Sequence, residues 1–183
     1  MTAGLLDSCR QTLQGWTAPT ADQDRLRRRY LDHLFDHPDG WSRSCRGAHL
    51  TASSLICAAD GQVLLTLHRR IGRWLQTGGH LEATDASVED AAFREAVEES
   101  GIDDLDLDLD HDPLLLSEHE VPCGIVRPTF HLDIQFLIRS KSAMAPVVGA
   151  ESLAVRWFRH DQLPEVDASV SALVQRAANR LGW

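Results

Sequence analysis

The sequence predicts an α+β fold in which a mixed β-sheet lies between layers of helices. Several short segments alternate apolar and polar residues, which is typical of strands that bury one face. One short helical segment with clear start and end signals interrupts these strands, and an amphipathic helix follows the last of them. The apolar share of 43% is enough for a sizeable core, so the 183 residues should form one compact domain with an appendage.

Residues 1–45 are expected to form a helical extension. Apolar residues keep a helical rhythm from Leu5 to Leu13, which predicts a first helix. Pro19 and Thr20 then open a second helix. The two helices could cover a cleft or form the interface of a homodimer. The apolar stripe of the second helix consists of Leu26, Tyr30 and Leu34.

Residues 46–183 are expected to form the main domain. Asp60 and Gly61 are typical of a hairpin turn between its first two strands. Apolar and polar side chains alternate most clearly in the strand predicted at 130–138. The predicted strands are 48–58, 63–67, 105–110, 114–116, 130–138 and 153–158, and the terminal helix is 166–181.

Three carboxylates gather on one face of the predicted central helix. Glu95, Glu98 and Glu99 are spaced i, i+3 and i+4, so they span roughly 100° of the helix circumference. Phe93 and Val97 fall on the opposite side and are predicted to face the core. Like charges this close repel one another, and a divalent cation with oxygen ligands would neutralise them. The alternative is a solvated, glutamate-rich helix face.

The residues around this helix favour the metal site over the solvated face. Gly78 and Gly79 precede the helix, and glycine lets a backbone approach a ligand closely. Ser87, followed three residues later by Asp90, predicts the start of the helix, and Gly101 predicts its end. The acidic helix is therefore expected to be short and to follow a glycine loop.

The segment 79–102 resembles the Nudix box, whose pattern is G-x5-E-x7-R-E-U-x-E-E-x-G-U, where U is aliphatic. The first half differs, because Asp85 occupies the first glutamate position and eight residues, rather than seven, separate it from Arg94. We interpret this as a loop variant in which Asp85 or Ser87 caps the helix rather than binding metal. The second half matches at every fixed position: Arg94, Glu95, Glu98, Glu99 and Gly101.

The resemblance implies a Nudix-type α/β/α sandwich, and the flanking segments 47–53 and 74–80 also resemble bacterial members with helical N-terminal extensions. It implies metal-dependent hydrolysis of a diphosphate linkage in a nucleoside diphosphate joined to another group, or in a related small phosphorylated substrate. Mg²⁺ or Mn²⁺ is the implied cofactor, because such ions lower the pKa of water and screen phosphate charge. A non-catalytic nucleotide-ligand sensor is the alternative. A diphosphate isomerase is a third hypothesis, but the contexts of Cys57 and Cys123 do not support it.

The resemblance also assigns roles to the matching residues. Glu98 and Glu99 are expected to be the primary metal ligands, and the carbonyl of Gly79 could complete the metal shell. Glu95 matches a position that is either a ligand or the base that activates water. Arg94 matches the arginine that orients a glutamate of the box.

A catalytic base outside the box is also expected, because its position varies within the family. Glu151 is the main candidate, since it lies just before the last strand; a solvated loop acid is the alternative. Glu118 and Glu120 are further options. Glu82 matches a frequent acid of the loop and is a weaker site candidate.

Five residues are candidates for substrate binding. His80 could contact phosphate or hold the glycine loop. Arg69 and Arg73 precede that loop and could reach a diphosphate. His131 and Asp133 share one face of a strand, where they could line a cleft or form a buried histidine–aspartate pair.

The net charge of −9 argues against binding to a nucleic-acid polymer or an anionic membrane. It allows a small phosphorylated substrate, because a metal can carry the positive charge. No apolar stretch is long enough to span a membrane. The four cysteines are scattered without a C-x-x-C pair, and no signal peptide is evident, so reduced thiols in a cytoplasmic protein are expected.

One pair of histidines has a spacing that could suit a metal. His33 and His37 are four residues apart at the end of the second predicted helix. The H-E-x-x-H pattern is absent, and no cysteine pair is nearby. We therefore interpret this pair as a solvated helix end and do not expect zinc.

Overall fold

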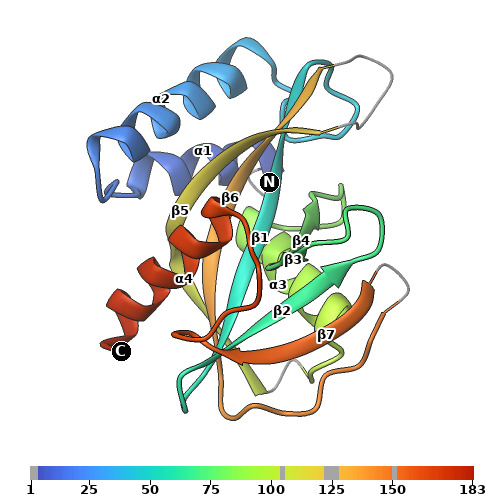
Figure 1. The fold of residues 1–183 in the computed structure, drawn as a ribbon. Helices are drawn as coiled ribbons and strands as arrows, with labels where there is room; N and C mark the ends of the chain where they lie inside the picture. The colour runs from blue at the N-terminus through green and yellow to red at the C-terminus, as the bar shows by residue number, and fades with distance from the viewer. Residues whose placement is uncertain (1–3, 104–105, 122–127, 150–151) are drawn as a thin grey trace.

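The computed structural model describes residues 4–103, 106–121, 128–149 and 152–183 (Figure 1). Four helices and seven strands are present in these ranges. The helices are α1 (Leu5–Gly15), α2 (Ala21–Asp36), α3 (Val88–Ser100) and α4 (Ala168–Leu181). The strands are β1 (Ala48–Ala58), β2 (Gln62–His68), β3 (Trp74–Leu75), β4 (Thr77–His80), β5 (Leu107–Val121), β6 (Thr129–Ser140) and β7 (Ser152–Arg159). The four helices and the strands β1, β2, β6 and β7 follow the predicted order.

The seven strands form one mixed sheet with β1 at its centre. The main order is β3-β2-β1-β6-β5, while β4 also pairs with β1 and β7 with β2. The pairing of β1 with β6 is parallel, and the other pairings are antiparallel. The predicted mixed sheet is therefore confirmed. This long central strand holds β4 and β6 on its two sides, and both contribute to the site described below.

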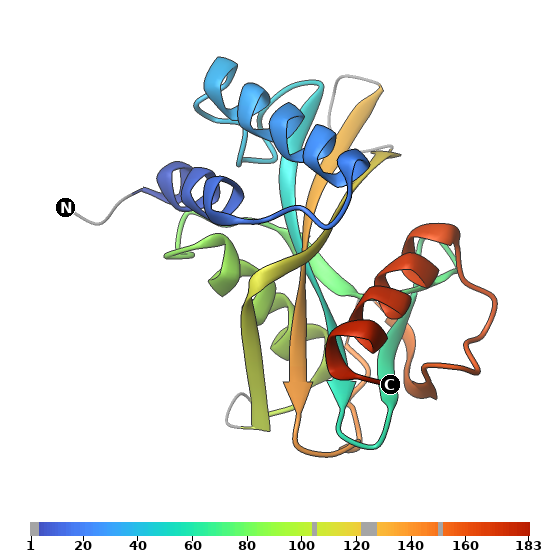
Figure 2. The same ribbon diagram turned by 90° about the vertical axis from the view of Figure 1, so that its left-hand side faces the viewer.

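Helices cover both faces of the sheet (Figure 2). On one face, α1, α2 and α3 pack on the side chains at even-numbered positions of β1, such as Leu50 and Ile56. On the other face, α4 packs on Leu55 and Cys57. Successive residues of a strand point to opposite faces, so the alternation in β1 supplies both cores. This arrangement is the predicted α/β/α sandwich.

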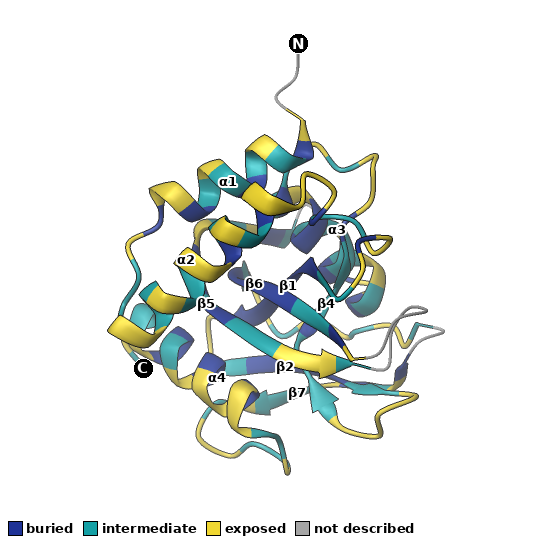
Figure 3. Cartoon of the chain, turned by 90° about the horizontal axis from the view of Figure 1, so that it is seen from above, coloured by how far each residue is buried: buried dark blue, intermediate teal, exposed yellow. Residues whose placement is uncertain are grey.

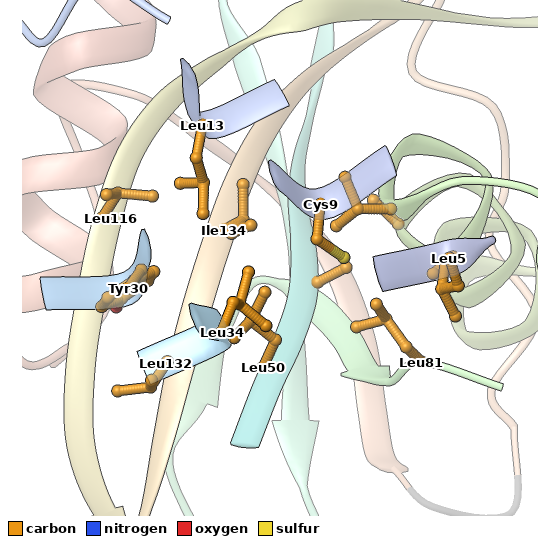
Figure 4. Close-up of a cluster of buried hydrophobic side chains, with 14 of the residues drawn as sticks. Leu5, Cys9, Leu13, Tyr30, Leu34, Leu50, Leu81, Leu116, Leu132 and Ile134 are labelled. Atoms are coloured by element: carbon orange, nitrogen blue, oxygen red, sulfur yellow. The ribbon is translucent and has the colours of Figure 1, made fainter. Parts of the chain in front are cut away.

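The N-terminal helices share a core with the sheet. Leu13 from α1 and Tyr30 and Leu34 from α2 lie in one buried cluster with Leu50 and Leu132 (Figure 4). Exposed residues lie on the outer sides of α1 and α2, while β1 and β6 of the sheet are mostly buried (Figure 3). Burial of several large apolar side chains stabilises this contact by about 1.5–3 kcal/mol each. The extension is thus part of the folded body.

Two strand predictions need correction. The glycine segment is a strand, β4, because Gly78 and Gly79 pair with Ser53 and Ala52 of β1. The strands predicted at 105–110 and 114–116 belong to one continuous strand, β5, whose register shifts between Asp110 and Leu115. A bulge accounts for this interruption of the alternating pattern, since an irregularity in the pairing re-aims the side chains that follow. Leu105 lies outside the described residues.

The buried row of α3 also differs from the prediction. Phe93 and Val97 pack only at the edge of the core and stay partly exposed. Small side chains allow the helix axis to come close to the sheet, so they occupy the fully buried positions. These positions are Val88, Ala91, Ala92, Ala96 and Ser100.

Candidate active site

Local signals hold α3 in the position that the sequence predicts. The Ser87 hydroxyl accepts a hydrogen bond from the backbone N–H of Asp90 at 3.0 Å, which caps the first turn. Gly101 ends the helix with φ of 64°, a left-handed conformation that favours glycine. Since the small buried residues fix which side faces the sheet, Glu95, Glu98 and Glu99 lie towards the neighbouring strand and pocket.

Strand β4 passes unusually close to the acidic face of α3. A Cβ atom on Gly79 would lie 2.5 Å from Oε1 of Glu95, so only glycine fits there. At Gly78, where φ is 155°, a Cβ atom would lie 2.3 Å from the Cβ of Ser53. The N–H of Gly78 donates to Oε2 of Glu99 at 3.3 Å. The two glycines therefore bring backbone polar groups against the carboxylates.

Arg94 connects the acidic helix to the turn before it. Its Nε donates to Oδ1 of Asp85 at 2.9 Å, and its Nη1 donates to Glu95 at 2.9 Å and to Glu98 at 3.3 Å. Its Nη2 also donates to the backbone carbonyl of His80 at 3.0 Å. Asp85 is the largest contributor to raising the pKa of Arg94, and Glu95 adds to it. The guanidinium therefore stays charged and orients two of the three glutamates.

Asp85 stabilises the turn before α3, but it does not cap the helix. Its side chain is 5% exposed and accepts hydrogen bonds from Arg94 and from the backbone N–H of Glu82. Ser87 is the residue that caps α3. The extra residue in the loop is thus accommodated in a turn that Asp85 closes.

A pocket of about 340 Å³ lies between α3 and β4. It contains the predicted metal ligands and Arg94, together with His80 and Glu82, whereas Asp85 and Gly101 of the box do not line it. The lining residues are Arg43, Gly78, Gly79, His80, Leu81, Glu82, Arg94, Glu95, Glu98, Glu99, Gly149 and Ser152.

The other predicted substrate residues lie elsewhere. Arg69 donates to the carbonyl of Ser152 at 3.2 Å and so borders the pocket without lining it. Arg73 is exposed and is not among the described residues that line the pocket.

Asp133 is 3% exposed and accepts hydrogen bonds from Thr51 at 2.9 Å and from Ser53 at 2.6 Å. These hydroxyls and the side-chain amide of Gln135, rather than a histidine, satisfy its carboxylate.

The candidate bases outside the box are separated from the pocket where they are described. Glu118 accepts a hydrogen bond from Arg29 of α2, and Glu120 is exposed on β5. Neither residue lines the pocket. Glu151 lies outside the described residues, and so does Cys123.

Four histidines form a chain of ring contacts beside the pocket. The ring centroid of His131 lies 4.9 Å from that of His49, 5.0 Å from that of His80 and 5.7 Å from that of His119. Burial, reinforced by neighbouring charges, lowers the pKa of His131 to about 3 and that of His80 to about 4. Burial also lowers the pKa of His49, although the Cys45 backbone acts in the opposite direction. The imidazoles of His80 and His131 are therefore neutral near pH 7, and burial favours the neutral form of His49 as well.

Sequence reasoning missed two contributors to this region. Arg43 lines the pocket from the turn before β1, and His49 lies in the histidine cluster. No local pattern marks either residue, because strand pairing over long sequence separations places them.

His33, predicted to be solvated, has a buried Nε2 with no hydrogen-bond partner in the described part of the chain. Its ring is covered by Gly40, where a Cβ atom would lie only 2.8 Å from Nε2.

The family model for the NUDIX domain matches residues 47–177, which is well over half of the chain. The chain therefore belongs to the Nudix family. No curated protein sequence gives a significant match. Nudix hydrolases act on pyrophosphate bonds, so membership supports hydrolysis of such bonds as the general activity.

Solved structures share this fold at low sequence identity. The C. elegans Ap4A hydrolase has a TM-score of 0.60 and 16% identity, over 73% of this chain and 97% of that one. The E. coli dihydroneopterin triphosphate pyrophosphohydrolase has a TM-score of 0.57 and 23% identity, over 71% and 95%. The NUDIX domain of Shewanella oneidensis NrtR, complexed with ADP ribose, has a TM-score of 0.58 and 17% identity, over 82% and 97%.

None of the helices in the described ranges has both the length and the apolar character that crossing a membrane requires.

The described cysteines, Cys9, Cys45 and Cys57, are free and buried. Burial raises the pKa of Cys57 to about 12, and this thiol packs in the core beneath α4. It is therefore poorly placed to act as the acid of an isomerase.

Proposed function

We propose that this protein is a metal-dependent hydrolase that cleaves a diphosphate linkage in a nucleoside diphosphate joined to another group, or in a related small phosphorylated substrate. The observation that carries the proposal is the convergence of Glu95, Glu98 and Glu99 with the backbone of Gly79 on one pocket. Such a set of oxygen atoms suits a hard divalent cation. Because the protein carries a net charge of −9, a bound cation would supply the attraction for an anionic substrate.

The residues present fit Mg²⁺ or Mn²⁺. Carboxylates and a backbone carbonyl are the ligand types that these ions prefer, and the missing side chain at Gly79 leaves room beside Glu95. Glu98 and Glu99 would be the primary ligands, with Glu95 and the carbonyl of Gly79 completing the set. When bound, the ion would lower the pKa of a water molecule and offset the charge of the phosphates.

The protein's own groups would supply orientation and proton transfer. Arg94 donates to Glu95 and Glu98 at once, so it fixes the direction of both carboxylates before substrate binds. We assign Glu95 as the ligand or base nearest the reacting water. Glu151 remains the candidate for a base outside the box. His80, which lines the pocket, would contact a phosphate, and Arg69 at the pocket border is a second candidate for that role.

Names of structural neighbours suggest which substrates to try first. They include a hydrolase of Ap4A, a pyrophosphohydrolase of dihydroneopterin triphosphate, and a domain complexed with ADP ribose. These ligands share a phosphate–phosphate linkage attached to a heterocycle-bearing group. A panel of such compounds, with and without Mg²⁺, would find the substrate.

The alternative function is a nucleotide-ligand sensor that binds without hydrolysis. A complete set of three glutamates, two of them held by Arg94, is more than binding alone requires, which favours the enzyme. We predict that Glu98→Gln lowers turnover by at least about 100-fold with little change in thermal stability, because a neutral amide is a poorer metal ligand. Glu165→Gln, at an exposed site outside the pocket, is the matched control. Equal turnover in the Glu98→Gln variant, or binding without any turnover in the wild type, would exclude the proposed activity.

A further inference from the structure

Strand pairing brings three histidines from distant parts of the chain to one face of the sheet. His49 of β1 lies directly opposite His131 of β6. His80 of β4 lies opposite Thr51, two residues further along β1 on the same face as His49. Because paired residues share a face and alternate residues return to it, all three imidazoles must project to the same side.

The nitrogen atoms of these three rings converge. Each of His49, His80 and His131 offers one ring nitrogen, and these atoms all lie within 4.8 Å of one another. Nitrogen ligands of a tetrahedral zinc ion, at about 2.0–2.1 Å from the metal, lie roughly 3.3–3.4 Å apart. Small rotations of the side chains would close the difference without moving the strands.

The cluster contains buried polar atoms that its protein surroundings do not satisfy. His49 is fully buried, and neither of its ring nitrogens has a hydrogen-bond partner among the described residues. Within the same part of the chain, Nε2 of His131 is also buried without a partner. A buried polar atom without a partner costs about 1–3 kcal/mol, so three such atoms in one place require an explanation. A bound metal ion would satisfy one nitrogen of each ring.

We propose that His49, His80 and His131 bind one divalent transition-metal ion, best represented by Zn²⁺, at a site beside the acidic pocket. His80 borders both, and in this site it is a metal ligand rather than the phosphate contact proposed above. Imidazole nitrogens select late first-row transition metals, whereas the carboxylates on α3 select Mg²⁺ or Mn²⁺. Three protein ligands leave one position of a tetrahedral ion for water or another ligand, as in zinc sites that bind exchangeable groups. The site does not depend on the function proposed for the pocket.

The two sites meet at strand β4. Gly79 and His80 are consecutive residues of the strand, so they face opposite sides of the sheet. The Gly79 position faces Glu95, and the side chain of His80 faces the histidine cluster. The carbonyl of His80 also accepts a hydrogen bond from Arg94 at 3.0 Å. An ion held by His80 would therefore fix the backbone that borders the acidic pocket.

The test uses tag-free, metal-free protein titrated with Co²⁺ in a large excess of Mg²⁺, which fills the acidic pocket. We expect one Co²⁺ per chain and the visible absorption of a tetrahedral nitrogen-ligated ion, displaced by Zn²⁺. His49→Asn and His131→Asn should each weaken this binding by more than about 100-fold, because each removes a ligand. Failure of the wild-type protein to take up Co²⁺ would overturn the proposal.

Two controls separate this site from its competitors. The double variant Glu98→Gln/Glu99→Gln should keep Co²⁺ binding, and so should His37→Asn, which alters a second possible metal group with Asp39 and Cys45. Loss of binding in either control, or retention in both cluster variants, would contradict the assignment. If the cluster variants do not fold, X-ray absorption of the zinc-loaded wild type identifies the ligands of the zinc ion. Three imidazole ligands support the site, and a shell of oxygen atoms alone excludes it.

Discussion

Asp85 and Arg94 form a two-point ion pair, with hydrogen bonds of 2.9 and 3.2 Å that join the turn before α3 to the acidic face of the helix. The carboxylate is almost fully buried, and the guanidinium continues to Glu95 and Glu98. Asp85 thus shares the charge of Arg94 with the two glutamates. In this loop variant of the box, the shorter aspartate keeps the arginine anchored despite the additional residue.

Asp85→Asn tests this anchoring. The variant leaves Arg94 to its remaining partners, which are Glu95, Glu98 and the carbonyl of His80, so it would compete more strongly with a bound cation for the two glutamates. We expect the Mg²⁺ concentration for half-maximal turnover to rise several-fold and the free energy of unfolding to fall by about 1.5–3 kcal/mol. Turnover as a function of Mg²⁺ and urea unfolding would measure the two effects. An unchanged Mg²⁺ dependence would show that Asp85 supports only the fold.

Gly79→Ala tests the close approach of β4 to α3. The added methyl group would meet the carboxylate of Glu95 at about 2.5–2.8 Å, so that side chain must move. We expect turnover to fall by at least about 10-fold, because the displaced carboxylate no longer matches the metal or water. Gly15→Ala is the control, since a Cβ atom there meets no other atom within 4 Å. Equal activity of both variants would exclude a positional role for Gly79.

Ser87→Ala tests the start of the acidic helix. The substitution removes the acceptor for the N–H of Asp90, and the loss of such a cap costs about 0.5–2 kcal/mol. Thermal or urea unfolding measures this loss, and Ser87→Thr should retain most of the stability. If the alanine variant is as stable as the wild type, the cap contributes nothing measurable.

The histidine cluster predicts a loss of stability in mild acid. His49, His80 and His119 face His131 from three strands, and burial together with these neighbours lowers the pKa of His131 to about 3. The unfolded chain takes up protons below about pH 6.5, whereas the folded cluster resists them, so folding is favoured less as the pH falls from 6.5 towards 3.

Urea unfolding with a chelator present measures this effect without bound metal. We expect the free energy of unfolding to decrease by roughly 1–3 kcal/mol between pH 7 and pH 4.5; the expected decrease is kept small because His80 and His131 are partly exposed. The variant His131→Asn removes one titrating group and should show a shallower pH dependence. An equally steep dependence in that variant would assign the acid sensitivity to other groups.

The predictable parts of the site are those with local signals. Ser87 and Gly101 mark the ends of α3, and the i, i+3, i+4 spacing of the glutamates fixes their common face. The glycine strand β4 was missed because two adjacent glycines carry no side chains with which to display alternation. Phe93 and Val97 were predicted to face the core from their position opposite the glutamates, and they do pack against it, but close packing on the sheet gives the fully buried positions to smaller residues such as Ala92 and Ala96.

The sequence by itself determined the class of fold, the acidic helix and the identity of the family, since each depends on residues within a few turns of one another or on a continuous motif. Only the tertiary structure decided that Arg94 is anchored by Asp85, that Asp133 is satisfied by hydroxyls, and that His49 and His131 meet. The pairing of β1 with β6 spans 82 residues in sequence, from Thr51 to Asp133. Register over such a distance follows from the packing of the whole sheet, which no local pattern contains.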